Sequence, residues 1–251
     1  MSSKILAALL FLASGMAAAG GPELPASYQG QDAEHWFKVV SGMQAAGLGA
    51  LDEQRFSFVV DLDNSPSFSL DYDAASGRFT MLYRMAFNNV AEGWSWEALA
   101  NPESADYYRF KFLPLLSTQE EKSAPVTVEL YPGMKREVKN LWRYDYFLAF
   151  ENLYDFYPRK ADDDAGFGAA VSLSADQARA LTEGGNVRML ARFRLKPPYH
   201  SESNTFWKAD FADPVDFTLR KRYLVGELLE VWFYDHASGK VLARLAPVRK
   251  D

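Results

Sequence analysis

The amino-acid sequence predicts an α+β fold with a predominantly antiparallel β-sheet, sandwich-like or curved, and three or four short helices. Apolar side chains recur at every second position in most segments, as they do in strands with one buried face. These segments mostly follow one another through short turns, which favours antiparallel pairing, and they do not alternate regularly with helices. The chain also contains 18 Phe, 13 Tyr and 6 Trp residues, and strands favour aromatic side chains.

Residues 1–19 have the layout of a secretory signal peptide. Lys4 precedes an apolar run over residues 5–13, and Ala17 and Ala19 stand as in an Ala-x-Ala cleavage site. The run is shorter than the ~20 residues of a membrane-spanning helix, although an uncleaved amphipathic or membrane-anchoring helix is the alternative interpretation. We therefore expect an exported protein, periplasmic or secreted, in which residues 20–251 form a single globular α+β domain.

The composition excludes several classes of site and partner. The chain has no cysteine, so it can form no disulfide, no thiolate metal ligand and no lipid-acylated cysteine. Its net charge is −6 and its basic groupings are small, whereas nucleic-acid-binding proteins present many cations to phosphates. No second apolar stretch is long enough to span a membrane. We therefore expect a soluble mature protein without a nucleic-acid partner.

The periodicity of apolar residues changes along the chain. Residues 31–45 have helical spacing, with Trp36, Phe37 and Val40 on one face and Asp32 placed to cap the start. Further helices are expected at residues 94–100, 144–152 and 174–181, although residues 135–157 fit either period poorly. Strands are expected at residues 55–62, 68–72, 78–87, 107–113, 126–131, 167–173, 187–195, 223–234 and 240–246.

One short sequence, Tyr-Asp-x-Ala-Ser-Gly followed by Arg or Lys, occurs at residues 72–78 and again at residues 234–240. Each copy lies between two segments of period two. Its aspartate can accept a hydrogen bond from the amide two residues later, and its glycine can supply the positive φ of a turn with a G1 bulge. We therefore predict two surface hairpins. A cation-binding loop is the alternative, but neither copy has the additional oxygen ligands of a calcium loop.

The most suggestive functional segment is residues 196–214, which contains three prolines and shows no apolar periodicity. We interpret it as a long loop, and ordered loops of this length often bind ligands or act as lids. The candidate ligand-binding residues combine flat rings with hydrogen-bonding groups: Tyr199, His200, Asn204 and Trp207, with Trp94 and Trp96 added by analogy. The alternative is a strap whose Phe206 and Trp207 are anchored in the core.

No local pattern indicates catalysis, a cofactor or a metal centre. The three histidines are scattered at positions 35, 200 and 236, and residues 162–164 form an acidic run typical of a solvated loop. The glycine-rich residues 166–171 lack the sequence context of a dinucleotide-binding site. We therefore expect no cofactor and no metal, and we assign no catalytic residue.

These observations favour a non-catalytic module that binds a protein, peptide or glycan in the cell envelope. A hydrolase that uses carboxylates without a local signature is the alternative, and an oligomeric structural protein of the envelope is a third hypothesis. An enzyme should present a deep pocket in which carboxylates with shifted pKa values converge. A binding module should present a shallow groove, an exposed strand edge or an apolar patch.

Overall fold

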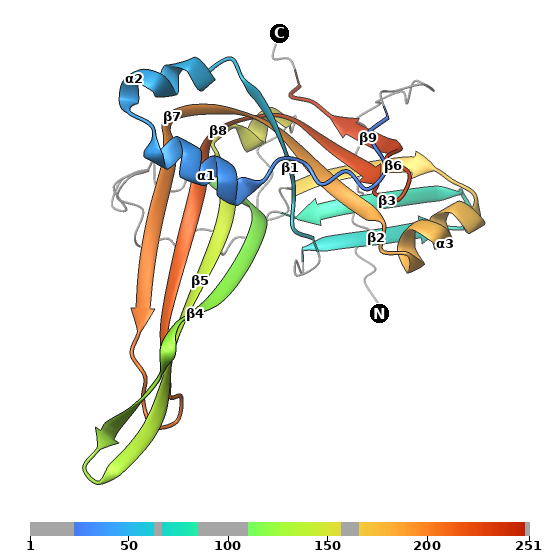
Figure 1. Ribbon diagram of the computed structural model, residues 1–251. Helices are drawn as coiled ribbons and strands as arrows, with labels where there is room; N and C mark the ends of the chain where they lie inside the picture. The colour runs from blue at the N-terminus through green and yellow to red at the C-terminus, as the bar shows by residue number, and fades with distance from the viewer. Residues whose placement is uncertain (1–22, 63–66, 85–109, 157–165, 249–251) are drawn as a thin grey trace, which may run out of the picture.

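Two β-sheets make up most of the part of the chain that the computed structural model describes, which is residues 23–62, 67–84, 110–156 and 166–248. The larger sheet has the strand order β1-β7-β8-β5-β4, with β9 paired to β8, and the smaller sheet has the order β2-β3-β6 (Figure 1). The strands are β1 (Arg55–Val59), β2 (Phe68–Asp73), β3 (Arg78–Arg84), β4 (Lys111–Tyr131), β5 (Met134–Phe150), β6 (Gly166–Ser172), β7 (Val187–Trp207), β8 (Val215–Asp235) and β9 (Val241–Leu245). The predicted α+β fold with mostly β-structure is confirmed.

The larger sheet is mixed, because one of its strand pairs is parallel. β5 and β8 run in the same direction from Lys139 opposite Val215 to Phe150 opposite Gly226. The other strand pairs within the described residues are antiparallel. Parallel neighbours need a long crossover, and here the chain passes through β6, a helix and β7 before β8 begins. The sequence prediction considered only neighbours along the chain and so did not include this pair.

Helices are fewer than the sequence predicts. In the described part of the chain, two have nine or more residues, α1 (Ala33–Gly42) and α3 (Ala175–Glu183). The short elements are α2 (Ala45–Leu48), η1 (Gly49–Leu51) and η4 (Asn152–Phe156). Both longer helices begin at the predicted caps: Asp32 accepts a hydrogen bond of 3.0 Å from the His35 amide, and Ser174 forms a capping box with Gln177.

The helix predicted at residues 144–152 is wrong, and the one predicted at residues 94–100 lies outside the described residues. Residues 144–150 belong to β5, and in its last stretch both alternating sets of side chains are buried. Leu148 and Phe150 point to one face, whereas Ala149 points to the other. A strand covered on both faces shows no alternation of apolar and polar residues, so its sequence resembles a buried helix.

Four strands of the larger sheet are unusually long and form an arm. β4, β7 and β8 have 21 residues each and β5 has 17. At about 3.3 Å per residue, 21 residues span about 70 Å. Figure 1 shows the four strands extending past α1 and away from the smaller sheet, with the β4–β5 hairpin at the far end. We call this extension the arm and the rest of the molecule the body.

The loop predicted at residues 196–214 is wrong for most of its length, because β7 continues to Trp207. The ladder between β7 and β8 is interrupted between Leu195 and His200. Two consecutive prolines lie in this interruption, where a residue without an N–H group costs no ladder hydrogen bond. The strand then resumes its pairing with β8.

Small polar residues explain why the second half of β7 has no apolar periodicity. Ser201 and Ser203 are buried, whereas Glu202 and Asn204 between them are exposed. The side chains therefore do alternate between a buried and an exposed face, as in any half-buried strand. Because serine occupies the buried positions, a search for apolar residues cannot detect this strand.

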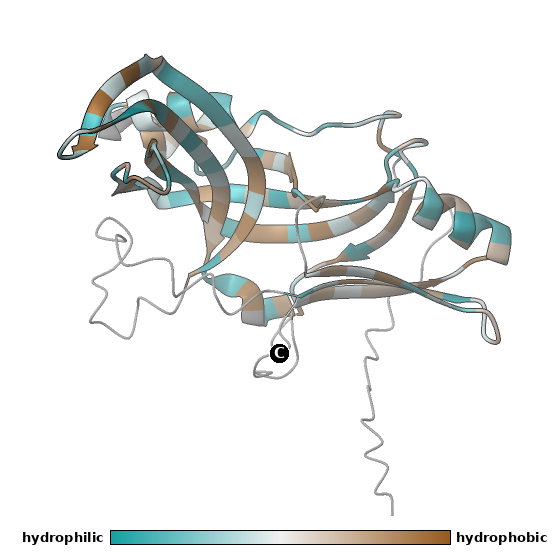
Figure 2. Cartoon of the chain, turned by 90° about the horizontal axis from the view of Figure 1, so that it is seen from below, coloured by the Kyte–Doolittle hydropathy of each residue, from teal (hydrophilic) through white to brown (hydrophobic). Residues whose placement is uncertain are grey.

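The main core joins the two sheets. It is a cluster of buried apolar residues drawn from α1, α3, the smaller sheet and the body halves of the long strands. Phe68 of β2 stacks on Phe233 of β8 with 6.4 Å between ring centres, so this pair connects the smaller sheet to the larger one. Figure 2 shows apolar and polar residues interspersed along the long strands, where they continue from the body into the arm.

The repeated sequence forms two hairpin turns, as predicted. Asp73 and Asp235 each accept a hydrogen bond from the amide two residues later, at 2.9 and 3.1 Å. Each also accepts a hydrogen bond from the serine hydroxyl of its own turn, at 2.6 and 2.5 Å, and in the first copy this bond holds the pKa of Asp73 below its usual range. Gly77 and Gly239 have φ values of +66° and +78°. The two copies therefore share a geometry.

Alanine substitutions at the two turn glycines should separate two losses of stability: the strain of a positive φ in the turn, and the steric overlap of the added Cβ with neighbouring residues. Gly77→Ala should lower the free energy of unfolding by about 1–2 kcal/mol, because alanine disfavours the left-handed conformation. Gly239→Ala should cost more, since its Cβ would also overlap the main-chain oxygen of Leu24, whereas the nearest atom to a Cβ at position 77 is 3.4 Å away. Urea unfolding of both variants tests this, and equal losses would contradict it.

Candidate functional site

The structure separates the residues that the sequence suggested for ligand binding. Tyr199 lies where the arm meets the body, and its hydroxyl donates a hydrogen bond of 2.9 Å to the carboxylate of Asp52. His200 is half-buried with its ring edge-on to Phe37 of α1 at 6.0 Å, and burial lowers the pKa of His200. Asn204 is exposed further along β7. Trp94 and Trp96 lie outside the described residues.

The side chain of Trp207 lies on the other face of the arm from the side chain of His200. Trp207 is seven positions after His200, so its side chain projects to the other side of the strand. There it stacks on Phe217 of β8 with 5.4 Å between ring centres. The four described candidates therefore do not form one site, and Trp207 is neither a core anchor nor a neighbour of His200.

Another group of side chains lies together on the face of the arm that continues from beneath α1, which we call the inner face. Three rings stand at alternate positions of β5, and two guanidinium groups stand at alternate positions of β8 beside them. Phe37 of α1 packs edge-on against the ring nearest the body, that of Tyr146, with 6.1 Å between ring centres. The group, which we call the ring–guanidinium cluster, consists of Trp142, Tyr144, Tyr146, Arg220 and Arg222.

Cations cover the faces of these rings. The guanidinium carbon of Arg220 lies 4.6 Å from the ring centre of Trp142, and that of Arg222 lies 4.5 Å from the ring centre of Tyr144. Lys122 of β4 approaches from the strand on the other side of β5, with its amine 5.1 Å from the Trp142 ring and 5.5 Å from the Tyr144 ring. Such contacts hold ring and cation together through the ring quadrupole. The cluster is therefore a preformed and ordered surface.

Hydrogen bonds connect the cluster to the body. Arg222 donates a hydrogen bond of 2.8 Å to the hydroxyl of Tyr146, which is almost fully buried. Burial raises the pKa of Tyr146, and the hydrogen bond from Arg222 offsets only part of this effect. Tyr146 therefore stays neutral at physiological pH and orients the guanidinium of Arg222.

Carboxylates compensate the cations of the inner face only in part. On β4, Glu120 forms an ion pair with Lys122, and hydrogen bonds from Lys122 and Tyr144 hold the pKa of Glu120 below its usual range. On β7, Glu202 lies between the two arginines, 3.2 Å from Arg220 and 3.4 Å from Arg222. Two guanidinium groups thus share one carboxylate.

The arginines also carry unsatisfied donors. The Nε atom of Arg220 is buried and has no hydrogen-bond partner in the described part of the chain, and the buried Nε of Arg222 has only the 3.4 Å ion-pair contact with Glu202, which is not a hydrogen bond. The rest of each side chain remains partly accessible, with 30% of Arg220 and 15% of Arg222 exposed. Burying a charged group without full pairing is unfavourable for stability, so a further hydrogen-bond acceptor at these arginines would offset part of that cost.

Sequence reasoning missed this cluster, although a signal for it is present. The rings of β5 recur at every second residue, and the two arginines of β8 are also two residues apart. Both patterns are visible once the segments are recognised as strands. What the sequence does not indicate is that these strands are parallel neighbours, since Tyr146 and Arg222 are 76 positions apart.

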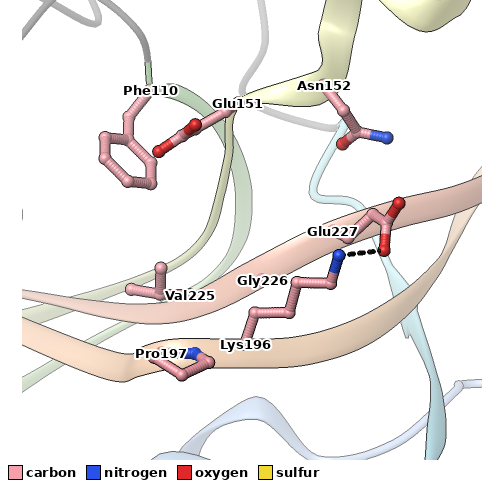
Figure 3. A pocket seen from close by; sticks show the side chains of 8 residues that line it. All are labelled: Phe110, Glu151, Asn152, Lys196, Pro197, Val225, Gly226 and Glu227. Carbon is pink, nitrogen blue, oxygen red and sulfur yellow. Dashed lines mark ion pairs between the residues drawn. The ribbon is translucent and has the colours of Figure 1, made fainter. Parts of the chain in front are cut away.

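A cavity of about 280 Å³ lies where the arm meets the body. Its lining, drawn in Figure 3, consists of Phe110, Glu151, Asn152, Lys196, Pro197, Val225, Gly226 and Glu227. Glu227 lies 2.6 Å from the amine of Lys196, and both polar groups of the Asn152 amide are used by the backbone of Leu228, at 2.8 and 3.0 Å. These polar groups are occupied by the protein itself.

The charge state of Glu227 also argues for a structural role. Burial raises the pKa of Glu227, but hydrogen bonds from Lys196 and Arg194 outweigh burial, and the net shift is downward. Among the described carboxyl groups, those with a resolved shift, Asp73, Glu120 and Glu227, all have a lowered pKa. A general acid at neutral pH needs a raised pKa instead.

The far end of the arm exposes apolar side chains. A second cavity, of about 450 Å³, is lined there by Leu141, Trp207, Lys208, Asp210, Asp213, Val215 and Phe217. Val126, Tyr131, Met134 and Phe206 are exposed nearby in the β4–β5 hairpin and at the end of β7. Of the acidic groups of this cavity, the carboxylate of Asp210 is occupied, because it accepts hydrogen bonds from two amides of its own turn, at 2.8 and 2.7 Å.

Within the described ranges, no group of three or more His, Asp or Glu side chains is arranged to hold a metal ion. None of the helices in those ranges is both long enough and apolar enough to cross a membrane. Comparisons with protein-family models, with curated proteins and with solved structures find no match to this chain.

Proposed function

We propose that this protein is an exported, non-catalytic binding module of the cell envelope, and that the ring–guanidinium cluster is its binding surface. One observation carries the proposal: Arg220 and Arg222 share the single carboxylate of Glu202 on a partly exposed face of the arm. An incompletely compensated pair of guanidinium groups is suited to bind an anionic group from outside. Export rests on the signal-peptide pattern of residues 1–19.

The alternative, a hydrolase that uses carboxylates, has less support. Its best location would be the 280 Å³ cavity, which Glu151 and Glu227 both line. Glu227 is held ionised by two cations, and an acid with a raised pKa has not been identified among the described residues. The cluster, in contrast, has ordered rings, accessible donors and no need of proton transfer. Binding is therefore the function that this geometry supports best.

A panel of probes tests the proposal on the full chain. Four are used: a peptide of alternating Glu and Thr, a peptide of alternating Lys and Thr, an oligogalacturonate, and a neutral oligosaccharide of glucose. We expect at least one probe to bind in isothermal titration calorimetry and the double variant Arg220→Ala/Arg222→Ala to lose at least about tenfold in affinity for it. Arg143→Ala is the matched control, because this arginine of β5 pairs with Asp145 on the opposite face.

The proposal is overturned if none of the four probes binds, or if the double variant binds as well as the wild type. Mass spectrometry of the probes after incubation separates binding from catalysis. Cleavage that Glu227→Gln abolishes would replace the proposal with the hydrolase alternative. Export is tested separately, since the amino terminus of the protein recovered from its native cells should lie near Gly20.

A further inference from the structure

We infer that the ring–guanidinium cluster recognises an extended peptide with carboxylate side chains at every second residue. The inference rests on the proposed function and specifies its ligand. It follows from three properties of the inner face: the spacing of its arginines, its uncompensated charge, and the way in which its rings are covered.

Spacing is the first property. Arg220 and Arg222 are two residues apart on β8, so their side chains project from the same face about 6.6–7 Å apart along the strand. An extended peptide places its own side chains i and i+2 on one side at the same interval. Carboxylates at alternate positions of such a peptide can therefore meet the two guanidinium groups in register, and a pair of adjacent carboxylates cannot.

Charge is the second property. In the described part of the chain, two oppositely charged pairs border the cluster: Glu120 with Lys122 on β4, and Glu34 with Lys38 on α1 at 2.7 Å. Among the described residues, Glu202 is the carboxylate paired with both arginines, and its distances of 3.2 and 3.4 Å exceed the 2.7–2.9 Å of strong charge-assisted hydrogen bonds. One positive charge remains uncompensated, so an incoming carboxylate can pair with an arginine without displacing a tight ion pair.

The covering of the rings is the third property, and it favours a peptide over a glycan. A sugar ring binds an aromatic residue by stacking its C–H groups on the ring face. Here cations occupy the faces of Trp142 and Tyr144, 4.5–5.5 Å from the ring centres. What remains for a ligand is ring edges, which carry partial positive charge, and the N–H groups of the cations. Both attract carboxylates.

Calorimetry with matched peptides tests the spacing. The probe is an eight-residue peptide of alternating Glu and Thr, and its control has the same composition with the glutamates in adjacent pairs. We expect the alternating peptide to bind the full chain at least about tenfold more tightly than the paired peptide, and its affinity to fall as the salt concentration rises. Equal affinity for the two peptides would overturn the inference.

Glu202→Gln provides a test that impaired folding cannot imitate. Removing the resident carboxylate leaves both guanidinium groups without a paired carboxylate, so binding of the alternating peptide should strengthen by about three- to tenfold. A purely structural role for Glu202 predicts unchanged or weaker binding. Arg220→Lys keeps the charge but removes the planar fork, and it should weaken binding, whereas Arg143→Ala on the opposite face should leave the affinity unchanged.

The outcomes distinguish this inference from the proposed function. If the oligogalacturonate or the neutral oligosaccharide binds at the arginines and the alternating peptide does not, the peptide inference is overturned and the binding function stands. If no probe binds, both are overturned. If the alternating peptide binds but Arg220→Ala/Arg222→Ala keeps that affinity, the peptide is recognised elsewhere and the inference is overturned.

Discussion

Replacing Phe233 with alanine is expected to lower the free energy of unfolding by about 3–5 kcal/mol, the range for a large aromatic residue in a close-packed core. The side chain of Phe233 is completely buried on β8, and its ring stacks on Phe68 of β2. Its loss would leave a cavity between the two sheets that the surrounding main chain can close only in part. Unfolding in guanidinium chloride, followed by circular dichroism, measures the loss.

Phe206→Ala is the matched control for this prediction. Phe206 is 57% exposed near the end of the arm, so its truncation should change the free energy of unfolding by no more than about 0.5 kcal/mol. Hydrogen exchange adds a spatial test, because the strands of the smaller sheet should lose protection in Phe233→Ala before those of the arm. Equal losses for the two variants would show that Phe233 does not join the sheets.

The features that were predictable from the sequence are those with a local signal. The cap at Asp32, the capping box at Ser174 and the two Asp–Gly turns each involve neighbouring residues, and each is confirmed. Their geometry depends on a few side chains that bond to the adjacent backbone, so distant contacts cannot easily override it.

The elements that were mistaken or shortened all have long-range causes. The end of β5 lacks alternation because packing covers both of its faces, and the second half of β7 lacks it because serines occupy the buried positions. β4 was predicted as two short strands, yet its ladder with β5 continues through several bulges from Lys111 to Tyr131. In each case tertiary contacts, which a local pattern does not contain, complete the strand.

The candidate site shows the same division between residues with a local sequence signal and residues brought together by long-range contacts. His200 and Asn204 were proposed from their residue types, and they lie on the strand that borders the cluster. The central residues were missed, since Trp142 and Tyr144 come next to Arg220 and Arg222 only through the parallel pairing of β5 with β8. The acidic net charge of the whole chain also concealed a local excess of positive charge, because composition averages over all faces of the molecule.

Gly226→Ala should be the second strongly destabilising substitution, with a loss of at least about 3 kcal/mol, at the upper end of the cost of overpacking. Gly226 pairs with Leu195 at the point where β7 is interrupted by its prolines, which is the junction between body and arm. A Cβ at this position would overlap the main-chain oxygen of Arg194 and approach the ring of Phe193 to 2.8 Å. Main chain in the middle of a sheet cannot move aside without breaking its ladder.

Gly168→Ala is the control for this effect, because it also places a methyl group on a strand, but the nearest atom is in the side chain of Leu82, at 3.2 Å, and the nearest main-chain atom is 3.9 Å away. It should lower the free energy of unfolding by about 1 kcal/mol or less, and a loss equal to that of Gly226→Ala would contradict the explanation by backbone overlap.

Since β8 carries both Gly226 and the two arginines, Gly226→Ala protein that still folds should also present the cluster at an altered angle to α1. Its affinity for an inner-face ligand should then fall even at temperatures where it remains folded, which links the close approach of two strands at the junction to the geometry of the binding surface.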